Sequence, residues 1–237
     1  MVTKNPHGAR RQMAVRVKTA KQRSPSSAAW LGRQLNDPYV AEAKRLGYRS
    51  RAAFKLIELD DRFHVLKRGS RVVDLGAAPG GWTQVAAARI GATEGKGRIV
   101  ALDILAMDPI PGAVILHRDF LAADAPAAIQ AELGGPADVV LSDMAQPATG
   151  HAATDHVRIV ALAEAAYDFA KEVLAPGGSF IAKVFQGGAE GDLLAALKCD
   201  FLRLRHAKPP ASRAESAEVY VVAQGFKVPN RKADPRS

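Results

Sequence analysis

The stretch VVDLGAAPGGW at residues 72–82 decides the fold, because it joins a β-branched run and an acid to a glycine-rich turn. The residues after the turn can start a helix, and such a strand–turn–helix lets a small ligand approach bare backbone at the carboxyl edge of a parallel sheet. The spacing is G-x-x-P-G-G, and Pro79 lacks one of the amide groups that bind a diphosphate at a helix start. The turn therefore favours a ligand without a diphosphate.

Strand-like and helix-like segments alternate through most of the remaining chain, without an internal repeat. The strand-like segments are residues 71–75, 98–104, 113–120, 137–144, 179–185, 201–208 and 217–226. Helical patterns occupy residues 37–46, 50–66, 82–90, 124–133, 155–174 and 192–198. This alternation predicts an α/β fold with a mostly parallel sheet and helices on both faces. The last two strands have no helix between them, which predicts an antiparallel end to the sheet.

The net charge of +9 at pH 7 is concentrated in residues 1–36, which hold eight Lys and Arg and no acid. This segment is poor in large apolar residues and contains SPSS at 24–27, which predicts a disordered basic tail. We expect one domain over residues 37–228 and a short tail at 229–237. A nucleic-acid arm is the favoured interpretation of the basic tail, ahead of a solubility extension and an organellar transit peptide.

The single cysteine, Cys199, excludes internal disulfides and a cysteine-based zinc site. It lies near the end of an apolar helical pattern, which predicts a place in the core. No apolar run is long enough to span a membrane, and no signal-peptide segment lies near Met1. We expect a cytoplasmic protein that acts as a monomer without a membrane partner.

Three charged residues interrupt segments that otherwise look buried. Lys183 lies within FIAKVF, Glu218 opens EVYVVA, and Lys55 lies within AAFKLI. A buried charge is costly unless it is paired. Together with Asp143, which ends a strand-like segment, these two cations and two acids are expected to meet at one site. A buried ion-pair network without catalysis is the alternative interpretation.

Five motifs in this chain are similar to those of one enzyme family. They are DLGAAPGGW at 74–82, SRAAFKL at 50–56, SDMA at 142–145, LAPGGSFIAKVFQG at 174–187 and SRAESAEVYVVA at 212–223. The chain resembles the FtsJ-type ribose 2′-O-methyltransferases from about Ser50 to Phe226. The resemblance implies a Rossmann-like methyltransferase fold, in which a mostly parallel seven-stranded sheet contains one antiparallel strand. It also implies the cofactor S-adenosylmethionine.

The resemblance assigns cofactor contacts to Asp74, Gly76, Gly80, Gly81, Trp82, Asp103, Asp119 and Asp143. Among them, Asp103 ends the second strand, where an acid is suited to bond ribose hydroxyls. Asp119 ends the third strand, where the family contacts the adenine. Trp82 either packs on the cofactor or packs only on the neighbouring helix. Each strand-end acid has an alternative role as a cap of a helix or turn.

The resemblance further implies a catalytic set of Lys55, Asp143, Lys183 and Glu218. Lys183 is expected to be the general base, since a lysine can accept a proton where burial or a neighbouring cation lowers its pKa. Asp143 would orient Lys183, while Lys55 and Glu218 would place the ribose. No metal is expected, because no leaving phosphate must be neutralised.

The implied reaction is methylation of the 2′-hydroxyl of a uridine ribose in large-subunit (23S) ribosomal RNA. Another RNA acceptor, such as transfer RNA or a cap, and a non-enzymatic ribosome assembly factor remain alternatives. Gln146–Pro147–Ala148 departs from the Pro-Asn pair common in the family, which puts local acceptor contacts in doubt. Surface cations expected to support RNA binding are Arg45, Arg49, Arg51, Arg203, Arg205, Lys208 and Arg213.

Overall fold

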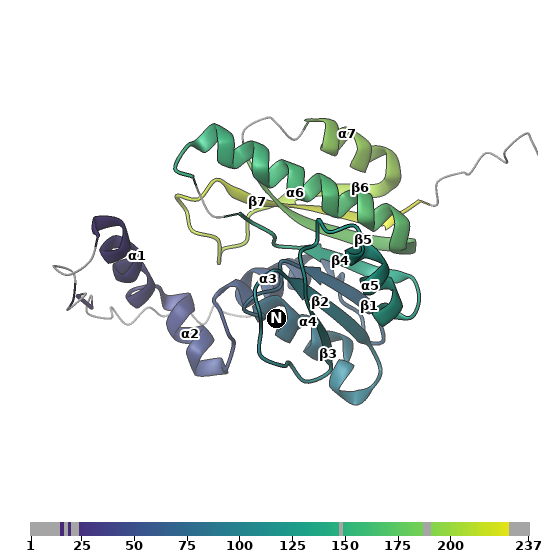
Figure 1. Ribbon diagram of the computed structural model, residues 1–237, viewed down its shortest axis with the longest axis horizontal. Helices are drawn as coiled ribbons and strands as arrows, with labels where there is room; N and C mark the ends of the chain where they lie inside the picture. Colours follow the sequence, from purple (N-terminus) through teal and green to yellow (C-terminus); the bar gives the residue numbers. More distant parts are fainter. Residues whose placement is uncertain (1–14, 17–18, 20–23, 147–148, 187–190, 228–237) are drawn as a thin grey trace, which may run out of the picture.

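A computed structural model describes residues 15–16, 19, 24–146, 149–186 and 191–227 (Figure 1). The helices are α1 Pro25–Leu35, α2 Pro38–Leu46, α3 Ala52–Phe63, α4 Gly81–Ile90, α5 Ala125–Leu133, α6 Ala152–Val173 and α7 Gly191–Asp200, with a short 3-10 turn, η2, at Ala92–Glu94. The strands are β1 Arg71–Leu75, β2 Arg98–Asp103, β3 Ala113–His117, β4 Ala137–Ser142, β5 Leu174–Phe185, β6 Phe201–Ala207 and β7 Glu218–Phe226.

The strands form one seven-stranded sheet in the order β3-β2-β1-β4-β5-β7-β6. The pairs from β3 to β5 are all parallel, whereas β7 runs antiparallel to both of its neighbours, β5 and β6. The predicted mostly parallel sheet with one antiparallel strand is confirmed. The last strand in the chain therefore lies inside the sheet, and β6, which precedes it, forms the edge.

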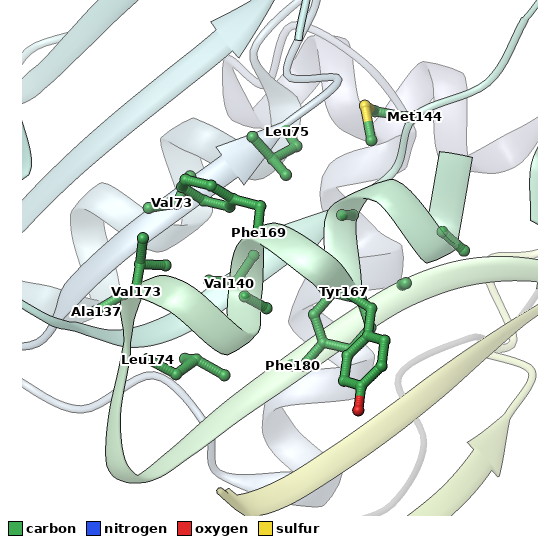
Figure 2. Packing of buried hydrophobic residues seen from close by; sticks show 14 of the residues in the cluster. Val73, Leu75, Ala137, Val140, Met144, Tyr167, Phe169, Val173, Leu174 and Phe180 are labelled. Atoms are coloured by element: carbon green, nitrogen blue, oxygen red, sulfur yellow. The ribbon is translucent and has the colours of Figure 1, made fainter. Parts of the chain in front are cut away.

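Helices cover both faces of the sheet, as the alternating pattern predicts. On one face, apolar side chains of α3 and α4, such as Leu56 and Val85, pack on strand residues that include Ile181. On the other face, α5, α6 and α7 cover a larger cluster. Figure 2 shows part of this cluster, in which Phe169 of α6 packs near Val140 of β4. The core thus fixes the strand ends from both sides.

The amino-terminal segment is more structured than the sequence predicts. Pro25–Leu35 forms α1, and the Ser24 side chain accepts a hydrogen bond from the Ser27 amide at 3.3 Å. The SPSS string therefore starts a helix here, because serine caps the first turn and proline suits its first position. This corrects the expectation that all of residues 1–36 lack structure. Most of residues 1–23 lie outside the described residues. In Figure 1, α1 lies beyond α2 at the outer side of the molecule.

The register of the parallel strands gathers the candidate site at one edge. Leu75 of β1 pairs with Leu102 of β2 on one side and with Ser142 of β4 on the other. The residues that follow these partners therefore emerge together at the carboxyl edge of the sheet, where ligands bind in such folds. Within the described ranges, no helix is long and apolar enough to cross a membrane.

Candidate active site

The glycine-rich turn after β1 passes close to the backbone that follows β4. Gly76 has a φ of +74°, and a Cβ added there would lie 2.7 Å from the Met144 Cα. The amides of Gly76 and Ala77 donate to the Leu102 carbonyl at 3.0 and 3.2 Å, which ties the turn to β2. A residue without a side chain is therefore required at position 76, both for backbone conformation and for space.

A cavity of about 530 Å³ opens beyond the ends of β1, β2, β3 and β4. Its lining residues are Gly76, Ala78, Leu102, Asp103, Ile104, Leu105, Asp119, Phe120, Leu121, Asp143, Met144, Ala145, Gln146 and Leu162. The volume is within the range of small-molecule and cofactor sites, which are mostly apolar with a few placed polar groups. Three of the predicted acids and one predicted glycine therefore share this cavity.

Two of these acids also hold the loops that border the cavity. Asp103 Oδ2 accepts the Ala78 amide and Oδ1 accepts the Leu105 amide, both at 2.8 Å. Asp119 Oδ1 accepts the Leu121 amide at 2.9 Å. Each carboxylate oxygen has further acceptor capacity for a ligand hydroxyl or amino group. The exposed Leu105 and Leu121, 64% and 59% accessible, offer apolar surface beside these acceptors.

Two other predicted cofactor residues point into the packed interior. Asp74 is fully buried beneath the turn and accepts a hydrogen bond from the Thr83 hydroxyl at 2.6 Å. Burial raises the pKa of Asp74 to about 7. The indole of Trp82 donates to the Ala52 carbonyl at 2.9 Å and lies 5.5 Å from the Tyr220 ring. Trp82 thus packs against α3, which was one of its two predicted roles, and neither residue lines the cavity.

The remaining two glycines of the turn also serve packing. A Cβ on Gly80 would lie 2.5 Å from Ile110 Cδ1, and a Cβ on Gly81 would lie 2.5 Å from Ser50 Oγ. Gly80 has a φ of +109°, a conformation that side chains disfavour. These positions let the turn and the start of α4 sit closely against neighbouring loops, outside the cavity lining.

The structure brings together the four charged residues expected to meet. Lys183 Nζ donates to the Asp143 carboxylate at 2.9 Å and to its backbone carbonyl at 2.7 Å. Lys55 Nζ lies 2.6 Å from Glu218 Oε1. The side chains of the four are only 8–16% exposed, so each charge is opposed by a partner in a poorly solvated site. The two ion pairs form one cluster, which we call the tetrad.

Tyr220 joins the two halves of the tetrad, a contact that the sequence analysis missed. Its hydroxyl lies 2.8 Å from Asp143 Oδ1 and 3.1 Å from Glu218 Oε1. The strand register places Tyr220 of β7 opposite Lys183 of β5. The signal that could have found it is the alternation of β7, because residues two apart on a strand share a face and Tyr220 follows Glu218 by two.

The surroundings shift the pKa values of Asp143 and Tyr220 in opposite directions. Burial alone would raise the pKa of Asp143, but attraction to Lys183 and Lys55 outweighs it and lowers the pKa below its usual value. Burial, with Asp143 and Glu218 close by, raises the pKa of Tyr220 well above 10. Asp143 is therefore ionised and Tyr220 stays a hydrogen-bond donor. With one proton, the hydroxyl can donate to one of the two carboxylates at a time.

The segment between β6 and β7 holds Glu218 from the other side. The Ser212 hydroxyl donates to Glu218 Oε1 at 3.0 Å, and the Ala211 amide donates to Glu58 of α3 at 2.7 Å.

Arg51 lies 3.0 Å from Asp37, so this predicted RNA contact is engaged in an ion pair. The segment Gln146–Pro147–Ala148, which differs from the family's Pro-Asn pair, is described only at its first residue. Gln146 lines the cavity, and residues 147–148 lie outside the described residues.

A sheet with β7 inserted antiparallel, an acid-lined cavity beyond the strand ends and the adjoining tetrad together define a Rossmann-like methyltransferase. The chain belongs to the FtsJ-like methyltransferase family, whose match covers residues 48–226. This family membership agrees with the resemblance carried by the sequence motifs.

Curated relatives extend the similarity over nearly the whole chain. Ribosomal RNA large subunit methyltransferase E of Paramagnetospirillum magneticum is 66% identical over 224 residues, covering 94% of this chain and 92% of that protein. The protein of the same name from Azorhizobium caulinodans is 64% identical over 217 residues, covering 92% and 90%. A solved Plasmodium falciparum structure, described as a ribosomal RNA methyltransferase, has a TM-score of 0.67 at 30% identity and covers 76% of this chain and 98% of its own.

Proposed function

We propose that this protein transfers a methyl group from S-adenosylmethionine to the 2′-hydroxyl of a uridine ribose in large-subunit (23S) ribosomal RNA. The observation that carries the proposal is the double position of Asp143. Asp143 lines the cavity, and its carboxylate also accepts hydrogen bonds from Lys183 and Tyr220. A methyl donor in the cavity and an acceptor at the tetrad would therefore be neighbours, as group transfer requires.

The residues around the cavity fit S-adenosylmethionine. Asp103 and Asp119 offer carboxylate acceptors for ribose hydroxyls or an adenine amino group, and the apolar side chains of Ile104, Leu105 and Leu121 flank them. The carboxylates also suit a ligand that carries positive charge. When bound, the cofactor supplies a methyl group already activated by its sulfonium, so the protein must mainly align the acceptor and remove its proton.

Lys183 is the proposed general base. As the base, Lys183 must be the neutral amine, whose two N–H bonds can keep both contacts to Asp143 and so fix its orientation. The remaining lone pair of Nζ would accept the proton of a ribose hydroxyl when that oxygen takes the methyl group that the cofactor would supply. Lys55 and Glu218 would position the ribose from the opposite side of Tyr220. The requirement for a 2′-hydroxyl also selects RNA over DNA.

The proposed RNA substrate rests on the curated relatives, which are named for the large ribosomal subunit. The eight cations of residues 1–36 would add phosphate contacts, since clustered Lys and Arg release counterions from RNA. We propose that the protein acts as a monomer in the cytoplasm, where ribosomal RNA is assembled into particles.

The test is transfer of labelled methyl from S-adenosylmethionine to purified large subunits, free ribosomal RNA and transfer RNA, followed by mapping of the modified ribose. Label at a uridine 2′-oxygen of the large subunit is the expected result. Label on transfer RNA alone would contradict the proposed substrate and identify transfer RNA as the acceptor. Cofactor binding without labelling of any RNA would favour an assembly role on the same fold.

A further inference from the structure

Arg49 is half-buried, and its guanidinium donates hydrogen bonds to the backbone of two loops. Its Nη1 donates to the Asp108 carbonyl at 2.7 Å and to the Pro79 carbonyl at 3.3 Å, and its Nη2 donates to the Pro109 carbonyl at 2.7 Å. Pro79 belongs to the glycine-rich turn, and the other two acceptors belong to the loop between β2 and β3. One guanidinium therefore joins both loops.

These are the two loops that border the proposed cofactor cavity. Ala78 lines it from the turn, and Ile104 and Leu105 line it from the loop after β2. Asp103 ties the same two loops at their inner end, through the Ala78 and Leu105 amides. Arg49 ties them further out, so the loops are joined at two separated points that involve opposite charges.

The position of Arg49 is itself fixed by hydrogen bonds to α4 and by close contact with the glycine-rich turn. Its backbone amide donates to Gln84 Oε1 of α4 at 2.8 Å, and the Gln84 amide group donates to the Gly47 carbonyl at 3.0 Å. The side chain also passes the turn closely, because a Cβ added to Gly80 would lie 3.2 Å from Arg49 Cδ and Nη1. A planar guanidinium with several donors in a fixed arrangement suits three carbonyls, whereas lysine offers a single point charge.

We infer that Arg49 is a positioning residue for the methyl donor, which sets the separation of the two cavity loops, and that RNA phosphate is not its partner. The inference rests on the proposed function, because it takes the cavity as the S-adenosylmethionine site. Loss of the guanidinium leaves three carbonyls without their charged donor and removes the link that it makes between the glycine-rich turn and the loop after β2. The consequence is weaker cofactor binding with RNA affinity retained.

The experiment measures cofactor binding without RNA, by titration calorimetry of S-adenosylhomocysteine into the full chain and its Arg49→Ala and Arg49→Lys variants. Arg68→Ala is the matched control, since Arg68 is an exposed arginine that pairs with Glu94 and has no proposed role in binding. We expect the Kd to rise about ten- to a hundredfold for both Arg49 variants and to stay unchanged for the control. Added guanidinium ion should restore part of the affinity of Arg49→Ala, a response that general destabilisation would not give. Thermal unfolding confirms that each variant is folded.

RNA binding by the same proteins separates the alternatives. Unchanged cofactor affinity in the Arg49 variants, combined with weaker RNA binding and a salt slope lowered by about 0.9, would make Arg49 a phosphate ligand and overturn the inference. Weaker cofactor binding that added guanidinium does not restore, in variants that also unfold at a lower temperature than wild type, would assign the effect to general destabilisation and would also overturn the inference. Wild-type protein that binds S-adenosylhomocysteine but methylates no ribosomal RNA would defeat the proposed function and leave this inference standing.

Discussion

The buried carboxyl of Asp74 should make the stability of this protein depend on pH in a way that one substitution removes. Asp74 is fully buried, and its Oδ1 has no hydrogen-bond partner among the described residues. Its pKa is about 7 in the folded chain, against 3.8 for the ordinary group. Between these values the unfolded chain releases the proton and the folded chain keeps it, so this group favours unfolding increasingly as pH rises.

The magnitude follows from the two pKa values. Proton linkage at about 1.4 kcal/mol per pH unit gives an unfavourable contribution of about 4 kcal/mol at pH 8 and about 2 kcal/mol at pH 5. Asp74→Asn keeps the shape and an acceptor for Thr83 but cannot ionise. The free energy of unfolding of the variant, relative to wild type, should therefore increase by about 2–3 kcal/mol between pH 5 and pH 8.

The assay is urea unfolding at pH 5, 6, 7 and 8, followed by circular dichroism, with wild type and variant compared at each pH so that shared titrations cancel. Asp168→Asn serves as control, because the Asp168 side chain is 70% exposed and pairs with Lys171. A difference between Asp74→Asn and wild type that stays constant over this range would refute the assignment of an elevated pKa to Asp74.

Four further outcomes are expected. Lys183→Ala should abolish methyl transfer in the labelled-methyl assay while cofactor affinity by calorimetry stays near normal; substantial turnover would remove Lys183 as the base. Tyr220→Phe should lower kcat about ten- to a hundredfold, because a hydrogen bond to a charged group is worth about 1.5–3 kcal/mol, and an unchanged kcat would leave the tyrosine a packing role only. Gly76→Ala should unfold at lower temperature, since its Cβ would lie 2.7 Å from Met144 Cα; equal melting temperatures would contradict this contact. Deletion of residues 1–23 should weaken RNA binding and flatten its salt dependence, and an unchanged slope would mean that this segment does not contact phosphate.

Local patterns along the chain were sufficient to predict the fold and the composition of the tetrad. The alternation of strands and helices predicted the parallel sheet, and the strand-like 217–226 predicted its antiparallel member. Lys183 and Glu218 were identifiable because a charge inside an apolar strand needs a partner. The same reasoning could not identify Tyr220, since a tyrosine in a buried strand looks like ordinary core until a second strand places two carboxylates beside its hydroxyl.

Other features depend on contacts between distant segments and were not visible in the sequence. Arg49 looked like a surface cation, yet its three acceptors lie 30 to 60 residues away. Cys199, expected in the core, is exposed, because the helical pattern continues to the end of α7 and turns this position outward.

The insertion of β7 between β5 and β6 has a consequence for the protein's own biosynthesis. Among the described residues, all that line the cavity precede residue 163, whereas Glu218 and Tyr220 belong to the last strand of the sheet. During translation, the cavity residues are therefore synthesised before Lys183, Glu218 and Tyr220, and β7 must enter a gap that β5 and β6 leave open. Strand order alone thus delays activity until synthesis has passed the final strand.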